Sequence, residues 1–148
     1  KYCDKGFITI NTKIEGKYFK IINTHLNADA IFSTYEKCEE TRLRQISQLL
    51  GKISNKNKHD IILCGDFNID FTSITGKKIY KKIKSLSTSC INSKKMITFD
   101  DHNSQYDQIF YIPKYRSTYS CRYKVFDEKY KKLSDHYPIQ LTLTRHEK

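Results

Sequence analysis

Three short clusters of acidic, amide and imidazole side chains stand out in this sequence. The first carries His25, the second carries Asp66 and Asn68, and the third carries Asp135 and His136. Side chains of these types can activate a water molecule, bind a hard divalent cation and donate hydrogen bonds to phosphoryl oxygens. Phosphoester hydrolysis needs all three of these contributions. The clusters are therefore candidates for one metal-dependent hydrolytic site.

Each cluster also has a simpler structural explanation when it is taken alone. An Asp and an Asn directly after a strand, such as Asp66 and Asn68, commonly bond their own backbone in a turn. A single His at a strand end, such as His25, is more often a satisfied structural side chain. The third cluster, with Ser134 before Asp135, has the composition of a turn that precedes a strand.

A β-hairpin is expected near the start of the chain. Residues 7–13 alternate between apolar and polar side chains, a turn follows at 15–17, and residues 18–24 form a second strand-like run. Side chains two residues apart share one face of a strand. The hairpin would therefore carry His25 to a strand end, on the same side as apolar groups.

The second cluster follows a different kind of strand. Residues 61–64 form a short apolar run that Gly65 ends, which predicts a central strand buried on both faces. Apolar positions at helical spacing predict helices at residues 36–53 and 76–86. Further strands are expected at residues 96–99, 108–112 and 139–143. This mixture of strands and helices predicts the α/β (α+β) class.

Composition limits the partners and the compartment. The 148 residues include 27 Lys and Arg against 16 Asp and Glu, a net charge of +11 that favours an anionic partner such as nucleic acid or a membrane surface. A Lys-rich solvated surface explains the same charge. Five scattered cysteines without a C-x-x-C pair favour a reducing intracellular compartment, with secretion left open. No apolar run in the sequence has the length of a membrane span.

Taken together, the clusters resemble the motifs of the endonuclease/exonuclease/phosphatase (DNase I-like) superfamily. The most specific part is GDFN at residues 65–68 followed by SDHYP at residues 134–138, with Asp107 between them. The resemblance runs from Gly6 to Leu143, in the family's order. It implies a four-layer αββα sandwich. Residues 1–148 would be roughly its second half, the C-terminal part of one domain whose N-terminal half is absent.

The resemblance also implies a role for each residue at a matching position. Asp66 would orient or deprotonate the attacking water, and Asn68 would hydrogen-bond the transition state. His136 would contact the phosphate, positioned by a hydrogen bond to Asp107. His25 would donate to a phosphoryl oxygen or to the leaving group. Joint occurrence favours these roles, because the separate structural explanations would otherwise all have to hold at the positions of one known active site.

A divalent cation is part of the same expectation. The resemblance implies that Asp135 is a metal ligand, with Mg²⁺ as the expected ion and Mn²⁺ as a substitute. Family members carry their principal metal ligand, a Glu, in the first half of the domain, and nothing in this sequence replaces it. We therefore expect the complete protein to be an enzyme and the 148 residues alone to be inactive.

The substrate stays open between several readings. A sphingomyelinase-like phosphodiesterase acting on phospholipid headgroups is favoured slightly over a nuclease or nucleic-acid repair phosphodiesterase. A catalytically inactive family member that acts as a binding module is a further alternative. Surface loops at residues 28–40 and 87–103 would line the mouth of the site, where substrate choice is usually made. Asp100-Asp101-His102, in the second loop, is expected to be plain surface.

Overall fold

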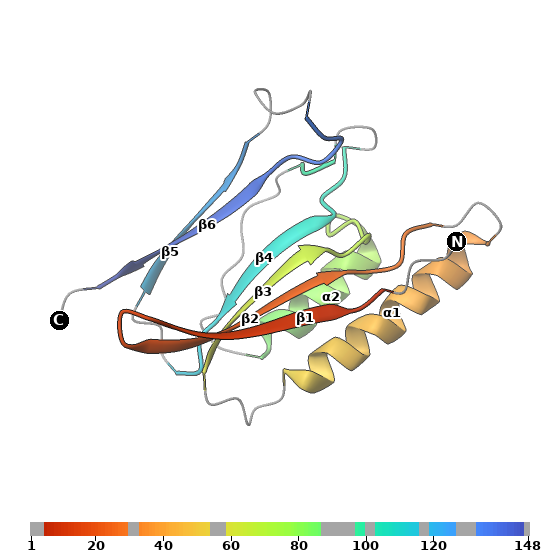
Figure 1. The fold of residues 1–148 in the computed structure, drawn as a ribbon. Coiled ribbons are helices and arrows are strands. Elements are labelled where there is room, and N and C mark those ends of the chain that lie inside the picture. Colours follow the sequence, from red (N-terminus) through yellow and green to blue (C-terminus); the bar gives the residue numbers. More distant parts are fainter. Residues whose placement is uncertain are drawn as a thin grey trace.

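Two β-sheets and two helices make up the part of the chain that the structure, a computed structural model, describes (Figure 1). The described residues are 5–29, 33–53, 59–86, 97–99, 103–115, 119–126 and 133–146. None of the helices within these ranges is long and apolar enough to cross a membrane. The observed mixture of helices and strands confirms the predicted α/β class.

The larger sheet has four strands in the order β1-β2-β3-β4. Its strands are β1 (Phe7–Ile14), β2 (Lys17–His25), β3 (Asp60–Asp66) and β4 (Asp107–Ile112). The first two form the predicted hairpin, β2 and β3 run parallel, and β4 is antiparallel to β3. Because parallel neighbours need a crossover, helix α1 (Tyr35–Lys52) connects β2 to β3. The carboxyl ends of β2 and β3 therefore meet at one edge of the sheet.

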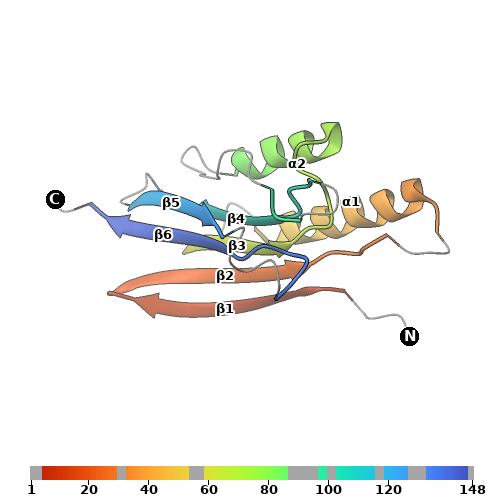
Figure 2. The same ribbon diagram turned by 90° about the horizontal axis from the view of Figure 1, so that it is seen from above.

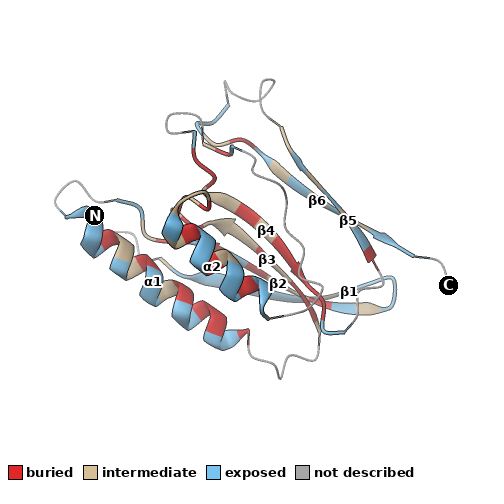
Figure 3. Ribbon diagram, turned by 180° about the vertical axis from the view of Figure 1, so that it is seen from behind, coloured by how far each residue is buried: buried red, intermediate tan, exposed pale blue. Residues whose placement is uncertain are grey.

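Helices α1 and α2 (Ile74–Lys84) cover one face of this sheet (Figure 3). Thr34 and Ser73 cap their N-termini by accepting hydrogen bonds from the backbone N–H groups of Lys37 and Gly76. Buried apolar side chains of both helices pack against β2, β3 and β4. The helices contribute Ile46, Leu49, Ile79 and Ile83, and the strands contribute Ile22, Leu63 and Phe110. The helices predicted at 36–53 and 76–86 are thus confirmed, the second one beginning two residues earlier at its Ser73 cap.

The opposite face of the sheet is only partly covered. Strands β5 (Tyr119–Val125) and β6 (Ile139–Arg145) form a second, two-stranded sheet that packs there through a small core of Phe19, Tyr111 and Tyr119. Seen from above, this sheet leaves β1 uncovered (Figure 2). Ile8 and Ile10 of β1 are accordingly 66% and 54% exposed. A cleft of about 360 Å³ with mainly apolar walls separates the two sheets.

Strand β3 differs from its prediction in two respects. It continues through Gly65 to Asp66, whereas the sequence predicted that Gly65 would end it. Gly65 has a φ of +136°, and a Cβ there would lie 1.8 Å from the backbone oxygen of Thr24, so the glycine allows close approach to β2 and does not break the strand. The strand is buried on its helix side, while on the other side Asp60 is buried and Ile62 and Cys64 are half-buried.

The later strands were predicted in part. Strands β4 and β6 are confirmed, and β6 extends two residues further than expected. Strand β5 was not predicted, although Tyr119, Cys121, Tyr123 and Val125 alternate with polar residues as a half-buried strand does. Of the short strand expected at 96–99, Met96 lies outside the described residues, and Phe99 forms only isolated bridges to Ser104 and His136.

Candidate active site

Three of the predicted residues stand side by side across the edge of the larger sheet. In the strand register His25 of β2 is opposite Asp66 of β3, and Asp66 is opposite Asp107 of β4. Cross-strand partners point to the same face of a sheet. The three side chains therefore form a row on the face that the helices do not cover. The structure brings them together from positions up to 82 residues apart in the sequence.

Asp66 is at the centre of this row. Its Oδ1 accepts a hydrogen bond from the backbone N–H of Asn68 at 2.7 Å. Its Oδ2 lies 3.3 Å from Nδ2 of Asn68, 3.5 Å from Nε2 of His25 and 3.9 Å from Nε2 of His136. Two imidazole nitrogens thus face one carboxylate oxygen at distances too long for strong hydrogen bonds. The arrangement leaves that oxygen able to accept a further donor or to bind a cation.

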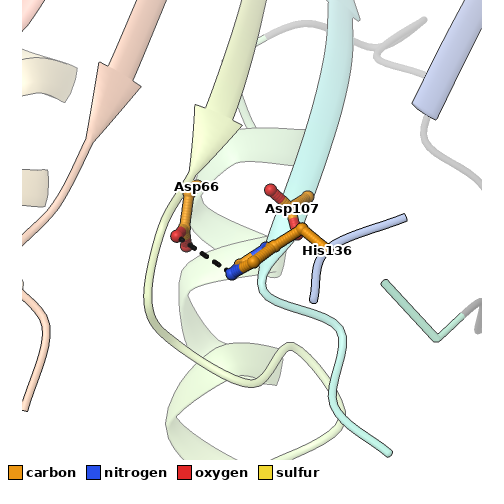
Figure 4. A group of neighbouring side chains, drawn as sticks. All are labelled: Asp66, Asp107 and His136. Carbon is orange, nitrogen blue, oxygen red and sulfur yellow. Dashed lines mark hydrogen bonds and ion pairs between the residues drawn. The ribbon is translucent and has the colours of Figure 1, made fainter. Parts of the chain in front are cut away.

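His136 joins the row from the segment that precedes β6 (Figure 4). Its Nδ1 is 2.8 Å from Oδ2 of Asp107, and its backbone N–H donates to Oγ of Ser134 at 3.0 Å. The ring also packs against Phe99, with 4.8 Å between the ring centroids. A carboxylate on Nδ1 orients the imidazole and leaves Nε2 directed toward Asp66.

Burial and charge act together on the Asp107–His136 pair. Burial raises the pKa of Asp107, and the hydrogen bond from His136 offsets this only in part. Burial by itself would lower the pKa of His136, but the hydrogen bond to Asp107 and the negative charges of Asp107, Asp66 and Asp135 outweigh it and raise that pKa above 6.5. The negative charges around His136 therefore stabilise its protonated form, which can donate from both ring nitrogens.

Asn68 combines a turn with a place in the site. It has a φ of +48°, in the left-handed region that Asn tolerates better than most residues. Its Nδ2 donates to the backbone oxygen of Leu26 at 3.1 Å as well as facing Asp66. The structural explanation from the sequence, a side chain bonded to its own turn, fits Asp66, whose Oδ1 accepts from the N–H of Asn68, whereas Asn68 bonds the distant backbone of Leu26. The same bonds hold Asp66 in place.

His25 and Asp135 are the more exposed members of the predicted set. The side chain of His25 is 56% exposed and contacts Asp66 alone within the described part of the chain. Asp135 is exposed and accepts one hydrogen bond, from Oγ of Ser134 at 3.4 Å. Its charge acts on His136. Its role as a metal ligand stays a prediction.

Ligand atoms suitable for a metal ion lie together elsewhere in the site. One such atom from each of Asp66, Asp107 and His136 lies within 4.8 Å of the other two. Two carboxylates and an imidazole fit Mn²⁺ better than Mg²⁺, which prefers oxygen ligands. Nδ1 of His136 is already occupied by Asp107, so Nε2 is the nitrogen available to a cation. The donor set is compatible with a divalent ion beside Asp66.

Thr98 supports the candidate site, and the sequence analysis missed it. It is fully buried, and its Oγ1 accepts a hydrogen bond from the backbone N–H of Asp107 at 3.0 Å. Its backbone oxygen accepts from the N–H of Tyr137 at 2.8 Å. Thr98 thus ties the start of β4 to the segment that carries His136. The strand-like run at 96–99 was the available signal, while Asp100-Asp101-His102 lies outside the described residues.

Comparison with known proteins supports the fold but not a particular activity. No protein-family model and no curated protein matches this sequence. Among solved structures, SmcL has a TM-score of 0.72 with 21% identity, over 95% of this chain and 58% of that one. A beta toxin mutant from Staphylococcus aureus with bound magnesium ions has a TM-score of 0.68 with 18% identity, over 93% and 57%.

A third solved structure extends the comparison. Sphingomyelinase C from Streptomyces griseocarneus has a TM-score of 0.64 with 16% identity, over 95% of this chain and 58% of that one. The chain therefore spans a little over half the length of these three structures. It has the fold of the corresponding part of the endonuclease/exonuclease/phosphatase (DNase I-like) proteins.

Proposed function

We propose that these residues form part of a metal-dependent phosphoester hydrolase. The observation that carries the proposal is the oxygen environment of Asp66, whose Oδ2 faces Nε2 of both His25 and His136 at 3.5 Å and 3.9 Å. A carboxylate flanked by two imidazoles can take a proton from water while the imidazoles donate to the oxygens of a phosphate. The shared DNase I-like fold supports the same activity.

The roles of the individual side chains follow from their bonds. Asp66 orients the attacking water and accepts its proton. His136, whose protonated form is stabilised by Asp107, donates from Nε2 to a phosphoryl oxygen, and His25 donates to another oxygen or to the leaving group. Asn68 holds Asp66 and, when its Nδ2 leaves Oδ2 of Asp66, donates to the transition state.

A divalent cation supplies positive charge that neutralises the phosphate oxygens when it is bound. Asp135 and Asp66 would offer oxygen ligands, which suit Mg²⁺ and Mn²⁺, while His136 in its protonated role would donate to the phosphate and would not bind the ion. The beta toxin structure with bound magnesium ions supports this assignment. Because the matched structures have longer chains, we propose that further metal ligands come from outside these 148 residues.

For the substrate we favour a phospholipid headgroup phosphodiester, with sphingomyelin as the first candidate. The similarity to sphingomyelinase C supports this choice. The net charge of +11 supports the alternative of a nucleic-acid phosphodiester. The two alternatives differ in salt dependence, because binding to a polyanion releases counterions and weakens steeply as salt is added.

The test is hydrolysis by the longest natural polypeptide that contains these residues. Sphingomyelin vesicles and fluorescent DNA and RNA would be offered with Mg²⁺, with Mn²⁺ and with EDTA. We expect metal-dependent cleavage and a loss of roughly 100-fold to 10,000-fold in kcat for Asp66→Asn. Glu40→Gln, an exposed carboxylate on α1, is the matched control and should keep full activity. No cleavage of any substrate by a folded protein would favour the binding module.

A further inference from the structure

Helix α1 carries a polar pair on its buried side that core packing alone does not explain. Arg42 and Gln45 are one helical turn apart and so share a face of the helix. The side chain of Arg42 is only 3% exposed. Both side chains contact the segment of residues 26–29, which directly follows His25.

These contacts give both polar backbone groups of Asn27, its N–H and its carbonyl oxygen, a hydrogen-bond partner. Nη1 of Arg42 donates to the backbone oxygen of Asn27 at 3.3 Å and to Oδ1 of Asp29 at 2.7 Å. Oε1 of Gln45 accepts from the backbone N–H of Asn27 at 3.0 Å. One peptide donor and one peptide acceptor of the same residue are thus held by two side chains of α1.

The preceding residue is held from the opposite side. The backbone N–H of Leu26 donates to the backbone oxygen of Asp66 at 2.9 Å, and its backbone oxygen accepts from Nδ2 of Asn68 at 3.1 Å. The segment therefore bridges helix α1 and the end of β3. His25 comes one residue earlier, at the end of β2, and its ring is exposed.

Burying the charged side chain of an arginine in a core costs free energy. The only carboxylate that pairs with it in the described ranges, Asp29, is itself 62% exposed, and Nε of Arg42 is buried without a partner there. An apolar side chain of similar volume is usually as stable or more stable at such a position. Unlike a methionine, the guanidinium can donate hydrogen bonds to residues 26–29.

We propose that Arg42 and Gln45 are positioning residues that hold residues 26–29 and thereby direct His25 toward Asp66. The structural part of this proposal is independent of the chemistry. Its consequence for turnover rests on the hydrolase function proposed above. The experiment below separates the two, because the first measurement does not require any activity.

The first measurement is amide hydrogen exchange at Asn27, in the longest natural polypeptide that contains these residues. Gln45→Met and Arg42→Met should each accelerate it roughly twofold to tenfold, since each removes one hydrogen bond from the backbone of Asn27. The matched controls are Gln48→Met and Arg44→Met, at exposed positions of the same helix, and they should leave it unchanged. Arg42→Lys should be intermediate, because the ammonium keeps the charge and the donors but not the planar geometry that places Nη1.

The second measurement is a double-mutant cycle with His25→Ala. Gln45→Met should lower kcat about tenfold with KM within about twofold, and should have no further effect when His25 is already alanine. A general loss of structure would lower kcat equally in both backgrounds. Gln45→Met is preferred for the cycle because it leaves Arg42 in place and disturbs folding least.

Unchanged exchange at Asn27 in both Gln45→Met and Arg42→Met would overturn the proposal, whatever the activity. Additive losses in the cycle would overturn the link to His25. Faster exchange in a folded protein that hydrolyses nothing would support the hold on the turn and would count against the hydrolase function alone.

Discussion

Two aspartates at opposite ends of strand β3 differ in how fully their oxygens are bonded. Asp60 is buried and receives the ammonium of Lys17 at 2.6 Å, the hydroxyl of Tyr111 at 2.5 Å and the backbone N–H of Lys114 at 3.1 Å. Asp66 has one short bond, and its second oxygen faces three nitrogens at 3.3 Å to 3.9 Å.

The difference separates a structural carboxylate from one that is available for chemistry. Both residues lie on the same face of the same strand, six positions apart. A carboxylate with short bonds to a cation and two further donors gains little from another ligand. One that faces its donors across a gap can still accept a water proton or a cation. The incomplete bonding of the Asp66 carboxylate thus distinguishes the end of β3 that carries the candidate site.

The largest expected effect comes from removing the bonded aspartate. Asp60→Ala removes the acceptor of the buried Tyr111 hydroxyl and of the partly exposed Lys17 ammonium, and we expect the free energy of unfolding to fall by about 3 kcal/mol. Asp66→Asn should change it by less than about 1 kcal/mol, because the amide keeps an acceptor for Asn68. Urea denaturation of both variants measures the contrast. Equal losses would remove the distinction between the two ends.

The second prediction concerns the glycine beside Asp66. Gly65→Ala places a methyl group against the backbone of Thr24, in a backbone conformation that alanine rarely adopts. We expect a loss of about 2 kcal/mol in the free energy of unfolding. The control is Gly51→Ala, where a methyl group meets nothing within 4 Å in helix α1 and should be neutral or stabilising. A neutral Gly65→Ala would mean that β2 and β3 need not approach so closely at the site.

A smaller effect is expected on the pKa of His136. Asp107→Asn removes the hydrogen bond and the charge that outweigh burial, so the pKa of His136 should fall. A two-dimensional NMR titration of the imidazole measures this change. Glu40→Gln, at a distant exposed carboxylate, should leave the midpoint where it was. An unchanged midpoint in Asp107→Asn would show that the other carboxylates alone set the pKa.

The same pair predicts a pH dependence of stability. Because the pKa of folded His136 lies above 6.5, its contribution is fully present below pH 6.5 and is lost as pH rises through the folded pKa. The contribution should stay under about 1 kcal/mol, since the side chain is 31% exposed and partly screened. Asp107→Asn should flatten the curve in that window. Urea denaturation at a series of pH values above 6.5 gives the slope.

Much of the fold could be predicted from local patterns. The hairpin, both helices and strands β3, β4 and β6 follow from the pattern of apolar residues in the sequence. The failures have local causes as well. Gly65 was taken as a strand end because glycine usually interrupts strands, and β5 was missed because four of its seven residues are only weakly apolar or charged.

The sequence by itself determined which side chains are available for chemistry, since His25, Asp66, Asp107 and His136 were all named from their types and motifs. Only the tertiary structure decided that they share one edge, because cross-strand register and the bridge at Phe99 join positions that are distant in the chain. The tertiary structure also decided that the carboxylate of Asp60 is held by short bonds while Oδ2 of Asp66 is not. Bonding capacity depends on the neighbours that folding supplies, and no local pattern contains them.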